Sequence, residues 1–191
     1  MKTFFLSASV PLRARHEAYY QTADVVAIRE SLRGLVAAVL PTSRLVFGGH
    51  PAITPMVRVG AQRMGLNVSN SVTLYQSAWF CEDFPQDNEA FEKLIVTERL
   101  QSRETSLSYM RHRMLTDQDY DAAVFIGGMN GIEEEWKLFG QHHPGVPRYP
   151  IASTGAAARI LFEKNTGLPE ELATEFAYLH LFRKHLLNER G

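Results

Sequence analysis

The chain has 191 residues, of which 45% are hydrophobic and 21% are charged. This length and composition predict one folded domain over residues 1–191 and exclude a disordered, collagen-like or coiled-coil protein. The 20 Lys and Arg residues nearly balance the 21 Asp and Glu residues, so the net charge of -1 does not favour binding to nucleic acid or to an acidic membrane.

The first half of the chain alternates apolar runs with helical patterns. Residues 3–8 and 44–47 are runs typical of buried strands. Between them, apolar residues recur at helical spacing over residues 22–40. After the second strand, Thr54 and Pro55 are predicted to be the N-cap and the first-turn proline of a helix.

The second half continues the same alternation. Residues 71–76 are predicted to form a strand, residues 80–88 a surface loop, and residues 89–93 a short helix that leads into a strand over residues 94–97. The later elements are a helix over 105–115, a strand over 121–126, a helix over 131–141, a strand over 148–152, an Ala-rich helix, and a terminal helix over 168–188.

Strands rich in Val, Ile and Phe that alternate with helices predict a mostly parallel sheet with helices on both faces. The fold class is therefore α/β, a doubly wound Rossmann-like sandwich, with its core over residues 3–164 and a C-terminal helix over residues 168–188. In such folds the ligand lies at the carboxyl ends of the strands, where the strand order reverses.

Small residues follow several of the predicted strands. Gly48-Gly49 and Gly127-Gly128 each lie between a strand and a helix, where backbone N–H groups can approach a phosphate. Glycine also serves tight turns, but two equivalent turns favour a phosphate or ribose site. Neither turn matches the P-loop or the dinucleotide-binding fingerprint. The candidate ligand-binding residues are Ser7, Ser9, Gly48, Gly49, His50, Thr54, Arg111, Gly127, Gly128, Met129, Gly131, Glu134, Ser153 and Thr154.

Three glutamates, Glu133, Glu134 and Glu135, follow the second glycine turn. They either complement the dipole of the helix that begins there or place one carboxylate in the site. In the second case that carboxylate holds ribose hydroxyl groups or polarises a water molecule. Their spacing does not choose among the three.

Three arginines and one histidine each have two possible roles. Arg103, Arg111 and Arg113 either face solvent or reach a phosphate, and His50 either binds a ligand or caps the first glycine turn. The single cysteine, Cys81, is expected to be a small buried or half-buried residue rather than a nucleophile. No set of Cys and His residues has metal-site spacing, so neither a metal nor a cofactor is predicted.

Several motifs together resemble the SLOG superfamily of Rossmann-like proteins. They are Phe5-Leu6-Ser7-Ala8-Ser9, Phe47-Gly48-Gly49-His50 with Thr54-Pro55, Thr105-Ser106-Leu107-Ser108-Tyr109-Met110-Arg111, and Phe125-Ile126-Gly127-Gly128-Met129-Asn130-Gly131-Ile132-Glu133-Glu134-Glu135. They occur in the expected order between residues 3 and 164. This superfamily takes in the Lonely Guy phosphoribohydrolases, the DprA proteins, the sensor domains of TRPM channels and the ligand-sensing domain of Thoeris antiphage effectors.

The resemblance implies a site for a nucleotide-derived ligand, NAD- or ADP-ribose-like, and it is closest to defence-associated members. Lonely Guy enzymes have a proline, a third glycine and a threonine where this chain has Ile126, Asn130 and Gly131. The leading hypothesis is therefore a ligand-sensing module in antiphage or stress signalling. The alternative is an N-glycosidase or phosphoribohydrolase in which Glu134 or Glu133 is catalytic.

The expected partners are a nucleotide-derived small molecule and an effector protein encoded elsewhere, with neither nucleic acid nor membrane. A homodimer is also considered, in which the helix over residues 22–40 or the helix over residues 105–115 packs against a second copy. The opening apolar run is too short for a signal peptide, no stretch approaches a membrane span, and one cysteine fits a reducing compartment. The expected location is the cytoplasm.

Overall fold

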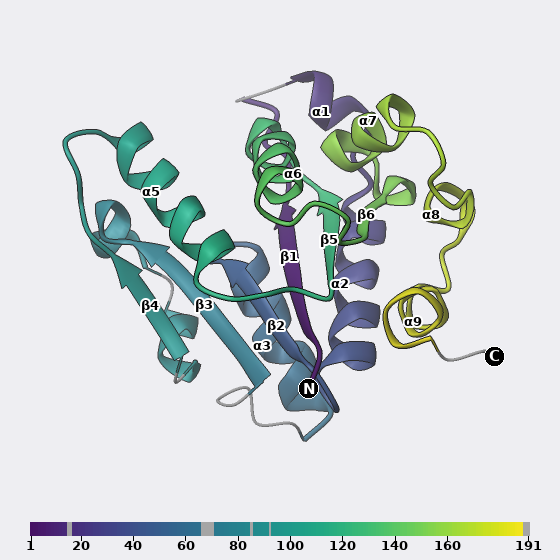
Figure 1. Cartoon of the computed structure of the whole chain (residues 1–191), viewed down its shortest axis with the longest axis horizontal. Helices are drawn as coiled ribbons and strands as arrows, with labels where there is room; N and C mark the ends of the chain where they lie inside the picture. The colour runs from purple at the N-terminus through teal and green to yellow at the C-terminus, as the bar shows by residue number, and fades with distance from the viewer. Residues whose placement is uncertain (15–16, 66–70, 85, 92, 189–191) are drawn as a thin grey trace.

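The computed structural model describes residues 1–14, 17–65, 71–84, 86–91 and 93–188. In this part of the chain, parallel strands form one six-stranded sheet in the order β4-β3-β2-β1-β5-β6 (Figure 1). The predicted α/β, Rossmann-like fold is confirmed. The strands are β1 (Thr3–Ser9), β2 (Arg44–Gly48), β3 (Val72–Ser77), β4 (Lys93–Thr97), β5 (Ala122–Gly127) and β6 (Arg148–Ile151).

Helices cover both faces of the sheet. They are α1 (Glu17–Thr22), α2 (Val25–Val39), α3 (Ile53–Arg63), α5 (Arg103–Thr116), α6 (Asn130–His142), α7 (Ala156–Lys164), α8 (Glu171–Thr174) and α9 (Tyr178–Phe182). Short 3-10 turns lie at Ala78–Asp83, Gln86–Ala90 and Ala152–Thr154, and a π-helical turn lies at Arg183–Leu187.

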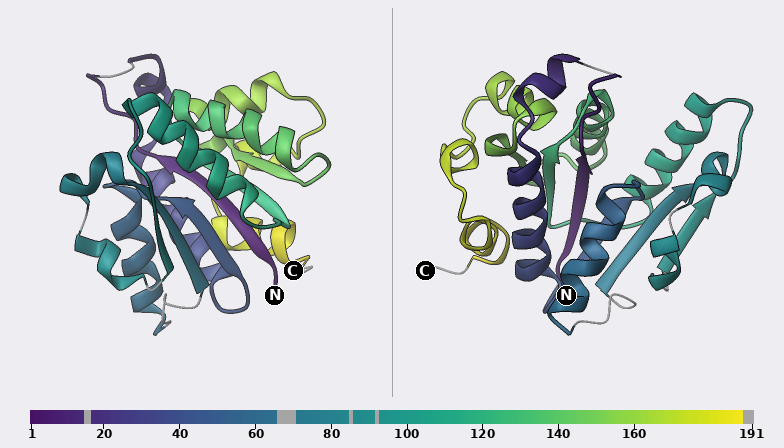
Figure 2. Two further views of the ribbon diagram at one scale, coloured as in Figure 1. Left: turned by 60° about the vertical axis from the view of Figure 1, so that its left-hand side comes forward. Right: turned by 180° about the vertical axis from the view of Figure 1, so that it is seen from behind.

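Strand β1 shows how the sheet separates two hydrophobic cores. Successive side chains of a strand point to opposite faces. Phe4 and Leu6 therefore pack in one core with α2, α3 and α9, whereas Phe5 packs in the other with residues of α5, α6 and α7. Figure 2 shows the first face from behind, with α2 and α3 in front of the sheet. Both faces of the sheet are covered, as continuous apolar strands require.

Helix α2 begins at Val25 because Asp24 caps it, with the carboxylate accepting the N–H of Ala27 at 2.8 Å. Its apolar positions recur on one side, and Ile28, Leu35 and Val36 are fully buried. Each such side chain contributes about 1.5–3 kcal/mol when it leaves water. The helical pattern predicted over residues 22–40 is thus a packing face within the chain's own core.

The predicted terminal helix over residues 168–188 is broken into α8, α9 and the π-helical turn. The break lies at Glu175, whose backbone is extended and whose carboxylate accepts the N–H groups of Phe176 (2.8 Å) and Ala177 (2.7 Å). The chain then approaches α2 at Gly34, where a Cβ atom would lie 2.7 Å from Cβ of Tyr178. Docking against α2 therefore replaces one long helix by short pieces.

Three local expectations are wrong. Thr54 lies inside α3, because Ala52 occupies the N-cap position and the carbonyl of His50 accepts the first free N–H groups. The region predicted as a loop and a short helix forms two 3-10 turns before β4, and residues 85 and 92 lie outside the described residues. Cys81 is exposed rather than buried.

Candidate functional site

The sheet has its switch point between β1 and β5. These two strands are neighbours, with Ser9 paired to Gly127 at their carboxyl ends. After β1 the chain returns through α2 on one face of the sheet, and after β5 it returns through α6 on the other face. The two connections thus diverge beyond these strand ends, and doubly wound folds bind ligands at such a point.

Four polar side chains from three elements meet at this switch point. Ser7 of β1 donates a hydrogen bond to Glu135 Oε2 at 2.6 Å, and Arg111 of α5 donates from Nε to Glu135 Oε1 at 3.2 Å. The Arg111 Nη1 atom also lies 2.5 Å from Glu134 Oε2. The side chains of Arg111 and Glu135 are 15% exposed, whereas that of Glu134 is 51% exposed. One partly buried cation thus holds one inner and one outer carboxylate.

The three successive glutamates point in three directions, as helical geometry requires. Glu135 faces the sheet and Glu134 lies at the solvent edge of the network. Glu133 accepts a hydrogen bond from the Tyr19 hydroxyl group at 2.6 Å and lies 3.4 Å from Lys164 Nζ. Burial and the Glu133 carboxylate raise the pKa of Tyr19 to about 12, so this hydroxyl group remains a donor at neutral pH.

The second glycine turn requires its glycines. Gly127 and Gly128 have φ values of 58° and 85°, and a Cβ atom on Gly128 would lie 2.0 Å from Cδ1 of Ile132. Their N–H groups donate inside the protein, from Gly127 to Thr154 Oγ1 and from Gly128 to the carbonyl of Ser9, both at 2.9 Å. These two N–H groups therefore hold the turn together.

The start of α6 is the part of this turn that suits an anion. Its N-cap residue, Met129, makes no side-chain capping hydrogen bond. Arg111 lies beside it, since a Cβ atom on Gly131 would be 3.0 Å from Arg111 Nη2. A helix N-terminus and an adjacent guanidinium group are both favourable to a phosphate.

Ser153 and Thr154 follow β6 at the same edge, and both take part in internal hydrogen bonds. Thr154 is fully buried, and its hydroxyl group donates to the carbonyl of Ile151 at 2.5 Å while accepting from Gly127. Ser153 Oγ lies 3.1 Å from the hydroxyl group of Tyr178. Thr154 thus ties the second glycine turn to the end of β6, and Ser153 ties this segment to α9.

The first glycine turn forms a separate group at the end of β2. The Gly49 N–H donates to the carbonyl of Tyr75 at 2.8 Å, and the His50 N–H donates to Thr54 Oγ1 at 3.1 Å. His50 Nδ1 accepts the N–H of Ala52 at 3.2 Å, so this histidine supports the turn. Gln76, which the sequence analysis did not single out, is 5% exposed and lies against the turn, since a Cβ atom on Gly49 would be 1.9 Å from its Nε2.

The structure separates the three arginines near α5. Arg111 alone among them joins the switch-point network. Arg113 pairs with Asp117 at 2.9 Å, and Arg103 lies over the ring of Phe80 at 5.7 Å from its centroid. The helical pattern could not show the contacts of Arg111 and Arg103, because both depend on how α5 packs against distant parts of the chain.

Helix α1 lies at the same edge of the sheet, near the ends of β1 and β5 (Figure 1). Thr22, its last residue, accepts the N–H of Ala156 with Oγ1 at 3.0 Å, and the Asp24 N–H donates to the carbonyl of Thr154 at 3.2 Å. Together with the bond between Tyr19 and Glu133, these contacts fix α1 to the first turns of α6 and α7. No periodicity in the sequence indicated this role for Tyr19.

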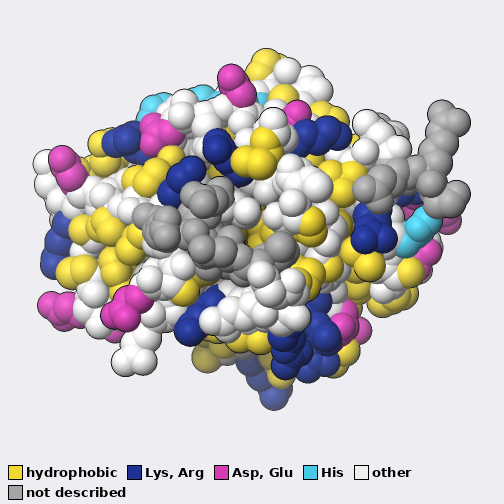
Figure 3. All heavy atoms as spheres, turned by 90° about the horizontal axis from the view of Figure 1, so that it is seen from below, with side chains coloured by type: hydrophobic (Ala, Val, Ile, Leu, Met, Phe, Trp, Pro, Cys, Tyr) yellow, Lys and Arg dark blue, Asp and Glu magenta, His cyan; other side chains and the backbone are white. Residues whose placement is uncertain are grey.

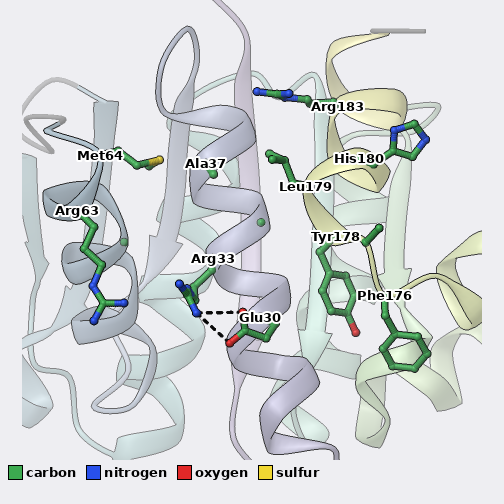
Figure 4. A pocket seen from close by; sticks show the side chains of 13 residues that line it. Glu30, Arg33, Ala37, Arg63, Met64, Phe176, Tyr178, Leu179, His180 and Arg183 are labelled. Atoms are coloured by element: carbon green, nitrogen blue, oxygen red, sulfur yellow. Dashed lines mark hydrogen bonds and ion pairs between the residues drawn. The ribbon is translucent and has the colours of Figure 1, made fainter. Parts of the chain in front are cut away.

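Two hollows lie away from the switch point. A groove of about 580 Å³ runs between α2, α3 and residues 176–183, with Arg33 and Glu30 paired at its wall and Arg63 opposite (Figure 4). A smaller hollow of about 260 Å³ lies between α6, β6 and the end of α7. The surface seen from below, at the amino ends of the strands, mixes apolar and charged side chains, with Lys and Arg gathered at its lower edge (Figure 3).

The model of the SLOG cluster3 family matches residues 18–186. The chain belongs to this family. The resemblance seen in its motifs is therefore confirmed, and SLOG membership indicates a role in binding or processing a nucleotide-related ligand. No curated protein and no solved structure matches the chain.

The described residues were also compared with the requirements of a metal site and of a membrane-spanning helix. Among the described residues, no group of three or more His, Cys, Asp and Glu side chains is arranged to hold a metal ion. In the same part of the chain, every helix is too short or too polar to cross a membrane.

Proposed function

We propose that this SLOG protein binds a nucleotide-derived small molecule, NAD- or ADP-ribose-like, at the switch point between β1 and β5. In this proposal it acts in the cytoplasm as the sensor of an antiphage or stress signal. The supporting observation is the convergence of Ser7, Arg111, Glu134 and Glu135 beside the uncapped start of α6. Cationic, hydroxyl and carboxylate groups at one point match the phosphates and ribose of such a ligand.

Each group has a distinct role in the proposed complex. Arg111 and the first turn of α6 hold a phosphate, and a carboxylate accepts hydrogen bonds from ribose hydroxyl groups. Glu134 is the carboxylate that can turn away from Arg111, because its side chain is 51% exposed while that of Glu135 is 15% exposed. Ligand binding therefore exchanges the ion pair of Arg111 with Glu134 for one between Arg111 and the phosphate.

This exchange also provides a route to a signal. Glu133, adjacent to Glu134 in the first turns of α6, holds Tyr19 of α1. A shift of this turn on ligand binding changes the position of α1, which a partner can detect. The proposed partner is an effector protein or a second copy of the chain, and light scattering with and without ADP-ribose measures whether the assembly changes.

Calorimetric titration with ADP-ribose, NAD and AMP tests the proposal. Replacing Arg111 by methionine removes a charged hydrogen-bonding group worth about 1.5–3 kcal/mol, so we expect binding to weaken by about tenfold to a hundredfold. Arg113→Met is the matched control, because Arg113 lies on the same helix and pairs with Asp117 instead. Equal affinity of the wild type and the Arg111→Met variant would place the ligand elsewhere.

The alternative function is that of an N-glycosidase or phosphoribohydrolase. The 2.5 Å contact between Arg111 and Glu134 favours it, since a positioned carboxylate can stabilise positive charge at an anomeric carbon or activate water. In that case Glu134→Gln retains ligand binding and loses release of the free base. Turnover equal to that of the wild type would exclude Glu134 as the catalytic group.

A further inference from the structure

The smaller hollow, of about 260 Å³, lies outside the proposed nucleotide site. It is lined by Trp136, Gly140 and His143 of α6 and its end, by Arg148 at the start of β6, and by Asn165 and Thr166 after α7. Arg148 begins its strand, so the hollow is near the amino edge of the sheet, whereas the switch point is at the carboxyl edge.

Contacts with α6 fix the position of the Arg148 guanidinium group. Its Cζ atom lies 4.2 Å from the centroid of the Trp136 ring, and Nη1 donates to the carbonyl of Trp136 at 3.0 Å. Gly140 leaves room for it, because a Cβ atom there would lie 2.4 Å from Nη1. A stacking face, a fixed acceptor and a missing side chain thus set the orientation of one cation.

This cation has no carboxylate partner among the described residues, unlike Arg58, Arg111 and Arg113. Arg148 is partly buried, and burial lowers the pKa of its guanidinium group from the ordinary value. A partly buried charge without a counter-charge is unfavourable, and an external anion would offset that cost. A guanidinium group has five N–H donors, so donors remain for such an anion after the bond to the Trp136 carbonyl.

We propose that this pocket binds a small oxyanion, either a carboxylate or a phosphate group, with Arg148 as its principal cation. The volume of about 260 Å³ is below the roughly 300–1,000 Å³ of sites for drug-sized ligands, which favours a small anion over a nucleotide. The planar guanidinium fork matches the two oxygens of a carboxylate or a phosphate. This site is independent of the proposed nucleotide site.

Trp136 serves as the reporter for the test. The chain has two tryptophans, and the other, Trp79, packs against Arg99. In a Trp79→Phe background, fluorescence and the arginine Nε–H NMR signals are recorded while sodium acetate or inorganic phosphate is added, with sodium chloride at equal ionic strength as the reference. We expect a saturable change with at least one oxyanion. No saturable change with either would overturn the proposal.

Two variants separate the fitted site from general charge attraction. Gly140→Ala keeps every charge but displaces the guanidinium group, and Arg148→Lys keeps the charge but removes the fork. We expect each to weaken oxyanion binding by about tenfold or more. The control is Arg159→Lys, at an exposed arginine paired with Glu163 on α7.

Each outcome decides the question. Binding of acetate alone assigns a carboxylate ligand, and binding of phosphate alone assigns a phosphate ligand. Circular dichroism shows whether each variant is folded. If Gly140→Ala does not fold, Arg148→Lys alone carries the test. Unchanged affinity in a folded Arg148→Lys protein would refute the assignment of Arg148.

Discussion

The ion-pair network at the switch point makes a quantitative prediction for the unliganded protein. Arg111→Met leaves the carboxylate of Glu135, which is 15% exposed, with Ser7 as its one remaining hydrogen-bond donor among the described residues. Removing one partner of a partly buried charged hydrogen bond costs about 1–3 kcal/mol. For a chain of this size, a loss of about 2 kcal/mol lowers the melting temperature by roughly 4–8 °C.

Urea unfolding followed by circular dichroism measures this loss. The control is again Arg113→Met, because Arg113 is 42% exposed and its ion pair with Asp117 is screened by solvent. We expect the control to lose clearly less stability than Arg111→Met. Equal losses would mean that the switch-point network contributes no more than a surface ion pair.

A double-mutant cycle attributes the effect to the intended pair. Glu135→Gln removes the charge that Arg111→Met would leave without a cation, so the double variant should be more stable than the sum of the two single effects implies. A strictly additive result would show that Arg111 and Glu135 are not energetically coupled, and would refute the reasoning from their geometry.

Three other predictions follow from single contacts. Gly128→Ala should lower the free energy of unfolding by about 1–3 kcal/mol, because φ is 85° and the new Cβ atom meets Ile132; calorimetric melting measures this, and an unchanged melting temperature would contradict it. Tyr19→Phe should increase amide exchange in α1, because it removes the 2.6 Å bond to Glu133; unchanged exchange would show that this bond does not hold the helix. The paired arginine lowers the pKa of Asp117, so this carboxylate stabilises the protein above an ordinary aspartate pKa of about 3.9 and loses that effect as pH falls through its lower folded-state pKa. Asp117→Asn should therefore flatten the acid side of the stability profile, and an identical acid side would contradict this assignment.

Local sequence patterns were sufficient to predict most of the strands and helices. Val, Ile and Phe runs mark the strands because these strands are buried on both faces, and the spacing in α2 matches its packing face. The prediction of one terminal helix over residues 168–188 was wrong for a physical reason. The Glu175 carboxylate binds the next backbone N–H groups, and Tyr178 packs closely against Gly34 of α2. A helical pattern contains no information about either.

The place of the candidate residues in the fold could be predicted, but not their contacts. The glycine turns and Ser7 lie at the carboxyl edge of the sheet, as expected, because polar and small residues at strand ends are visible in the sequence. The choice of Arg111 over its neighbours, and the different partners of the three glutamates, depend on how α5, α6 and α1 pack. Gln76 was missed because a glutamine within a strand gives no separate signal.

We propose that this SLOG protein binds a nucleotide-derived ligand without turning it over. The most direct test incubates the protein with AMP, ADP-ribose, NAD and cyclic ADP-ribose isomers, then identifies by mass spectrometry what the protein retains and what passes a filter. We expect an intact ligand to be retained by the wild type and by Arg113→Met but not by Arg111→Met. Free base with ribose 5-phosphate or ADP-ribose in the filtrate, or retention of none of these molecules, would contradict it.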